Sequence, residues 1–113
     1  MRIKINGSKW KVSWVKENSK KLLLEGSKCW GITHFDEKRI YLNKDLPKKE
    51  FRETAVHELT HAFLYEYDID LVSADDVEEN VCGFMEKRYK KIVKLAKKIT
   101  KAWEMRRTII ILQ

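Results

Sequence analysis

Apolar and polar residues alternate along the first fifteen positions, which is the pattern of strands with one buried face. The alternating apolar positions are Ile3, Ile5, Trp10, Val12 and Trp14. Asn6-Gly7 lies between the two runs and tolerates the positive φ angles of a type I′ turn. Residues 2–15 are therefore predicted to form two short antiparallel strands.

Two further runs, residues 29–35 and 39–43, predict a second pair of strands, because the turn residues Asp36-Glu37-Lys38 separate them. The period of two places four residues on their buried face, namely Trp30, Ile32, Ile40 and Leu42. The apolar run at residues 22–24 fits either a strand or a helical turn. The first 45 residues or so thus predict a small antiparallel sheet of three to four strands.

The periodicity changes after Pro47, whose missing N–H suits the first turn of a helix. We expect a helix over residues 48–67 and a loop over residues 68–73. Ser73 or Asp75 can then cap a second helix. A small sheet followed by two helices predicts the α+β class.

The second helix is predicted to begin near Asp76, since apolar residues recur every three or four positions between residues 77 and 103. Gly83 within it suggests a close approach of the two helices. The β-branched run at residues 108–112 argues against helix and predicts an added strand or a tail.

Length and composition predict a single domain over residues 1–113. No apolar run approaches the length of about 18 residues that a transmembrane helix needs, so we expect no membrane partner. The N-terminus lacks the apolar core of a signal peptide. Cys29 and Cys82 are the only cysteines, without Cys-x-x-Cys spacing, which indicates a reducing, cytoplasmic setting.

The net charge of +7 hides an asymmetry along the chain. Residues 50–80 carry ten acidic residues and one Arg, whereas the rest carries 23 basic and seven acidic residues. The acidic stretch fits a cation site, and the basic remainder is interpreted first as solvated surface. Residues 85–107 carry ten Lys or Arg against two Glu, yet only Tyr89 and Trp103 interleave with them. Nucleic-acid binding is therefore an alternative that we do not favour.

The strongest chemical signal is His57-Glu58-Leu59-Thr60-His61. On a helix, residues four apart project from one face, so two imidazoles can hold one Zn²⁺ at about 2.0–2.1 Å. Glu58 follows the first ligand and lies where it can act as general base on a zinc-bound water. A chance histidine pair on a surface helix is disfavoured, because an apolar stripe lies beside the motif. That stripe contains Ala55, Val56, Leu59, Ala62 and Phe63.

A catalytic zinc usually takes three protein ligands and one water, so a third ligand is needed. His34 is the only other histidine, and we interpret it as a lone residue near a turn. Glu79 lies 18 residues beyond His61 and shares a helix face with Cys82 that could turn toward the pair. The full set of candidate carboxylates at the start of the second helix is Asp75, Asp76, Glu78 and Glu79.

The run His57-Glu58-Leu59-Thr60-His61-Ala62-Phe63, followed by Glu78-Glu79-Asn80-Val81-Cys82-Gly83-Phe84, resembles small zincin peptidases with a glutamate third ligand. The closest kind is the minimal ImmA/IrrE-like metallopeptidase of phages and mobile elements. Gly31-Ile32-Thr33 and Ile40-Tyr41-Leu42 look like the sheet before the metal helix in such proteins. The resemblance covers about residues 30–100. It implies Zn²⁺ and hydrolysis of a protein or peptide substrate inside a cell.

Carried over residue by residue, the resemblance makes His57, His61 and Glu79 the zinc ligands and Glu58 the base. Glu78 is adjacent to Glu79, so either glutamate could be the ligand.

One position departs from related enzymes. Gly83 occupies the place of an aspartate that orients a histidine in thermolysin-like enzymes, so a different residue is needed for that role, and Asp75 and Asp76 are candidates. The alternative to an enzyme is a non-catalytic zinc-containing binding module. A structural zinc takes four protein ligands and rarely needs a glutamate between two histidines, so Glu58 favours the enzyme.

Overall fold

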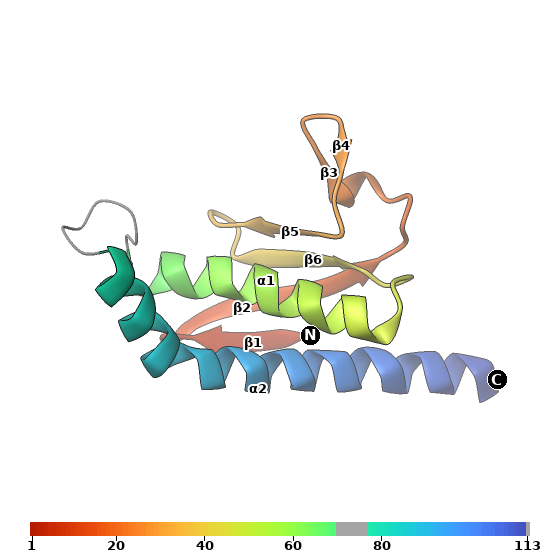
Figure 1. Ribbon diagram of the computed structural model, residues 1–113. Helices are drawn as coiled ribbons and strands as arrows, with labels where there is room; N and C mark the ends of the chain where they lie inside the picture. Colours follow the sequence, from red (N-terminus) through yellow and green to blue (C-terminus); the bar gives the residue numbers. More distant parts are fainter. Residues whose placement is uncertain (70–76, 113) are drawn as a thin grey trace.

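A small sheet with two helices packed beside it forms the protein (Figure 1). The computed structural model describes residues 1–69 and 77–112, with the side chains of residues 1–69 and 77–107. The elements are β1 (Arg2–Ile5), β2 (Ser8–Val15), the 3₁₀ turn η1 (Lys20–Leu22), β3 (Leu23–Leu24), β4 (Ser27–Lys28), β5 (Gly31–His34), β6 (Arg39–Asn43), α1 (Lys48–Glu66) and α2 (Val77–Leu112). The predicted α+β class is confirmed.

The N-terminal hairpin has the predicted turn. β1 and β2 pair antiparallel with Ile5 opposite Ser8, and Asn6 and Gly7 have φ angles of 49° and 79°. Two consecutive positive φ angles characterise a type I′ turn, whose twist matches that of the strands.

The four-stranded sheet has the order β1-β2-β6-β5, and its central pair is parallel. The prediction of a wholly antiparallel sheet is wrong at this pair. Parallel neighbours need a crossover connection of a dozen or more residues, and residues 16–38 provide it between β2 and β6. β5 then pairs antiparallel with β6 and forms an edge of the sheet.

The register of β5 corrects the predicted buried face. Ile32 pairs with Tyr41, so these two share one face, whereas Ile40 and Leu42 lie on the other. Ile32 is buried there, but Trp30 precedes the strand and is 55% exposed. Trp30 and Ile32 therefore do not share a buried face with Ile40 and Leu42.

The helix side of β5 has a glycine because α1 passes very close to it. A Cβ atom on Gly31 would lie 2.8 Å from Cγ2 of Thr54 and 2.9 Å from Cγ of Glu58. No side chain fits into that space unless these neighbouring side chains, or α1 with them, shift. Gly31 therefore sets how closely the helix lies against the edge strand.

Residues 22–24, which fitted either a strand or a helical turn, take part in both. Leu22 ends η1 and is fully buried, while Leu23 and Leu24 pair with β4 and are exposed. η1 contacts both β5 and β6.

α1 matches the predicted helix closely and is anchored at its C-terminal end. Oε1 of Glu66 accepts a hydrogen bond from Nε1 of Trp10 at 2.8 Å. The same oxygen forms an ion pair with Nζ of Lys38 at 3.0 Å. The backbone carbonyl of Glu66 accepts from the amide of Asn6 at 3.1 Å. Asn6 and Lys38 come from two different turns, so both hairpins hold the same helix end.

α2 begins near the predicted position, although Asp76 and the cap candidates Ser73 and Asp75 lie outside the described residues. It continues to Leu112, so the predicted strand or tail at residues 108–112 is wrong. Extending an existing helix avoids the free-energy cost of nucleating a new one. Each β-branched residue lowers helix stability by less than about 1 kcal/mol relative to alanine.

Gly83 does not mark a close helix approach, because a Cβ atom there would meet nothing within 4 Å. The helices are joined instead by stacking of Phe51 on Trp103, with ring centroids 4.3 Å apart. Neither helix, within the described residues, is long and apolar enough to cross a membrane.

Candidate metal centre

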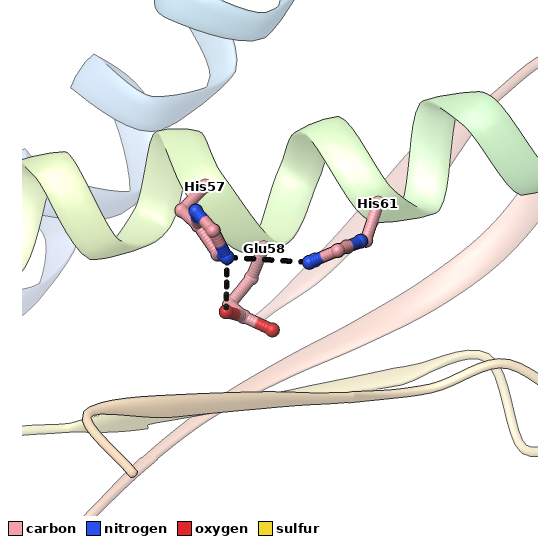
Figure 2. Close-up of side chains that lie close together, drawn as sticks. All are labelled: His57, Glu58 and His61. Carbon is pink, nitrogen blue, oxygen red and sulfur yellow. Dashed lines mark hydrogen bonds and ion pairs between the residues drawn. The ribbon is translucent and has the colours of Figure 1, made fainter. Parts of the chain in front are cut away.

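His57, Glu58 and His61 project from one side of α1 toward the strands (Figure 2). The Nε2 atoms of the two histidines are 3.2 Å apart, and their rings meet edge to face. The spacing of four residues produces this meeting, since one helical turn places the rings side by side. All three ligand-type atoms lie within 4.8 Å of one another.

This geometry fits a tetrahedral metal ion. Two nitrogens bound to one zinc at about 2.0–2.1 Å lie about 3.3 Å apart, close to the observed separation. Both histidines are exposed, so solvent and a substrate can reach the space between them. In the described part of the chain, no other group of His, Cys, Asp and Glu side chains converges in this way.

Glu58 differs from its neighbours in burial. Its side chain is 8% exposed, whereas that of His57 is 70% exposed. The hydroxyl of Thr33 donates to Oε1 of Glu58 at 2.8 Å and lies 3.3 Å from the Glu58 carbonyl oxygen. Oε2 lies 3.9 Å from Nε2 of His57. One carboxylate oxygen is thus held by the sheet, while the other lies beside the histidine pair.

Sequence reasoning did not assign a role to Thr33. Strand parity could have identified it, because Thr33 alternates with Gly31 and pairs with Ile40 on the helix side of the sheet. A polar residue at that position must find a partner on α1.

His34 is outside the cluster. It follows Thr33 and lies on the other face, with its ring 5.6 Å from that of Tyr41. A ligand role for His34 has no support from this placement.

Glu79 is not brought to the histidine pair in the described structure. It is exposed in the first turn of α2 and lines a hollow with Tyr67 and Arg88, apart from the cluster of three. Ile69 borders this hollow and also the hollow beside His61. The ligand role of Glu79, and the choice between Glu79 and Glu78, stay predictions. Asp75 and Asp76 lie outside the described residues.

Two hollows flank the pair along β5. One of about 400 Å³ adjoins His57 and is lined by Trp30, Gly31 and Thr54. The other, of about 420 Å³, adjoins His61 and is lined by Phe35 and Tyr65. An exposed aromatic residue from each end of β5 therefore borders the site.

Comparison with known proteins identifies one family. The model of the IrrE N-terminal-like domain, a peptidase family, matches residues 19–82, which is 64 of the 113 residues. The matched segment contains β5, β6, α1 and the His-Glu-His cluster, and it confirms the resemblance noted from the motif. No curated protein and no solved structure matches the chain.

Proposed function

This chain belongs to the family of IrrE N-terminal-like domains, which are peptidases, and we propose that it is a zinc-dependent metallopeptidase acting on an intracellular protein. The observation that carries the proposal is the 3.2 Å approach of two exposed histidine nitrogens beside the buried carboxylate of Glu58. Neither Cys29 nor Cys82 forms a disulfide bond in the structure, which supports a reducing, cytoplasmic setting.

His57, His61 and Glu79 would hold the ion, with Glu78 as the alternative third ligand. Two imidazoles and a carboxylate are a donor set typical of catalytic zinc. When bound there, zinc supplies Lewis-acid polarisation of the scissile carbonyl and lowers the pKa of water.

Glu58 would move the protons. The hydrogen bond from Thr33 occupies Oε1, so Oε2 is the oxygen available to take a proton from the attacking water. The same carboxyl group would then donate that proton to the leaving amine.

An extended substrate would lie along β5. This strand is at the edge of the sheet, so its outer backbone groups face away from β6 and can pair with a peptide. The hollows at Trp30 and at Phe35 lie at the two ends of that path and would receive apolar side chains.

The decisive test is Glu58→Gln, assayed by digestion of unfolded proteins and of a peptide library with zinc present. The amide is nearly isosteric but cannot accept the proton, so cleavage should fall by about 10²–10⁴-fold while zinc content stays unchanged. Cleavage at the wild-type rate would reject Glu58 as the base. A wild type that binds zinc but cleaves nothing would favour the non-catalytic binding module.

A further inference from the structure

Basic side chains from two distant parts of the chain line one groove between β1 and α2. Two adjoining hollows, of about 470 and 440 Å³, form this groove and share Lys4, Leu95 and Lys98. The basic lining residues are Arg2, Lys4, Lys9, Lys91, Lys94 and Lys98. None of the residues that line either hollow, in the part of the chain that is described, is acidic.

The helix wall of this groove belongs to a longer basic stripe. Residues 87–103 contain eight basic residues and no acidic residue. The stripe is formed by Lys87, Lys91, Lys94, Lys98 and Lys101, all of which are exposed. Their spacing of three and four residues places them on one helix face over about 21 Å.

This stripe is electrostatically unfavourable without a partner. Like charges at positions i and i+4 destabilise a helix, and Lys87 with Lys91 and Lys94 with Lys98 form such pairs. The ion pairs found among the described residues involve none of the groove lysines. A polyanion would relieve the repulsion on both walls at once.

The surrounding side chains favour a duplex backbone as that polyanion. Single-strand binders add exposed aromatic rings on which bases stack. Trp103 is buried against Phe51, and Tyr89 is about 160° around the helix from Lys91. Tyr67 lines the groove, but its side chain is half-buried and the guanidinium of Arg88 lies 4.0 Å over its ring. The groove therefore presents basic side chains above apolar residues. Such a surface can contact phosphate groups but makes no specific contacts with base edges.

We propose that the groove between β1 and α2 binds the phosphate backbone of double-stranded nucleic acid without sequence preference. β1 and β5 are opposite edges of the sheet, so this site is separate from the metal centre (Figure 1). The basic residues were expected to be solvated surface. The fold instead brings the basic side chains of residues 2–9 and 91–98 together in one groove.

Fluorescence anisotropy of the full chain with a labelled duplex of about 20 base pairs tests the proposal between about 50 and 200 mM salt. Duplex DNA and duplex RNA, with single strands of the same sequence, form the arms that identify the ligand. Binding should weaken steeply with salt and be tighter for a duplex than for a single strand. The variant Lys4→Glu/Lys94→Glu/Lys98→Glu should bind at least about tenfold more weakly, with a salt slope lower by about three.

A matched variant, Lys16→Glu/Lys20→Glu/Arg52→Glu, makes the same charge change at exposed residues outside the groove and should retain most binding. The milder Lys4→Gln/Lys94→Gln/Lys98→Gln covers the case in which the glutamates prevent folding. The proposal is overturned if no duplex binds at the lowest salt or if both triple variants lose binding equally. Tighter binding to polyglutamate or to anionic vesicles than to a duplex would also overturn it.

Discussion

The hydroxyl of Thr33 in β5 donates a 2.8 Å hydrogen bond to Oε1 of Glu58 in α1. This bond connects the edge strand, where a substrate would lie, to the carboxylate that would move the protons. Thr33 is therefore a positioning residue in the proposed mechanism, since it acts through Glu58.

Thr33→Val removes this hydroxyl and keeps the shape of the side chain. We expect kcat to fall by about ten- to a hundredfold with little change in KM, because misplaced catalytic groups cost rate rather than binding. Zinc content should be unchanged. Thr33→Ser restores the hydroxyl and should restore kcat, and a serine variant as slow as the valine variant would contradict this role.

Gly31→Ala should lower the free energy of unfolding by about 1–3 kcal/mol, because the new methyl group would lie 2.8 Å from Cγ2 of Thr54. Thr54→Ser removes that methyl group and should recover part of the loss in the double variant. Gly83→Ala is the matched control. It adds a methyl group within α2 with nothing inside 4 Å, so it should stabilise by about 0.5–1 kcal/mol. Urea denaturation measures all three.

His57→Ala and His61→Ala should each abolish stoichiometric zinc binding, measured as metal per chain after purification with zinc. The reason is that two remaining ligands hold zinc weakly. The wild type should retain about one zinc. A wild type that binds none when zinc is added would refute the metal centre.

Glu79→Ala should weaken zinc binding more than Glu78→Ala, since the resemblance noted from the sequence would make Glu79 the third ligand. Competition with a zinc-binding dye ranks the two variants. Equal affinities, or a greater loss in Glu78→Ala, would move the ligand assignment away from Glu79.

Glu66 should make stability depend on pH. Burial raises the pKa of this carboxyl, but hydrogen bonds from Lys38, Trp10 and Ser8 outweigh it, so its pKa lies below the ordinary 4.5. A lowered folded-state pKa means stabilisation that is complete well above pH 4.5 and is lost as pH falls through the folded-state value.

Glu66→Gln should therefore cost about 1–2 kcal/mol at pH 7, and the gap from wild type should close in strong acid. Urea unfolding at a series of pH values shows this. Glu53→Gln is the control, because Glu53 forms only a long, exposed pair with Lys49 and should change little. A gap for Glu66→Gln that stays constant down to acid pH would argue against the ionic contribution.

Local signals in the sequence predicted what depends on near neighbours. Asn6-Gly7 identified the hairpin turn, and the period around His57 and His61 identified α1 and the pairing of their rings. These features follow from backbone preferences within a few residues.

Features that depend on distant segments were missed. The parallel pairing of β2 with β6 requires a crossover whose path no short pattern specifies. The side of β5 that faces α1 depends on register, so Thr33 went unassigned and Trp30 was misplaced. The close helix approach predicted at Gly83 is wrong because helix packing also depends on distant segments. Only the packed helices show the open space around this residue.

The inner position of β6 has a consequence for folding. β6 follows every other strand in the sequence, yet the N-terminal hairpin joins the sheet only through it. The hairpin must therefore find its partner across the 23 residues at positions 16–38, a loop closure that slows folding. The family-matched segment, residues 19–82, lacks β2, so on its own it would expose an unpaired edge of β6 and lose Trp10, which holds Glu66. Expressed alone, that segment should aggregate rather than fold.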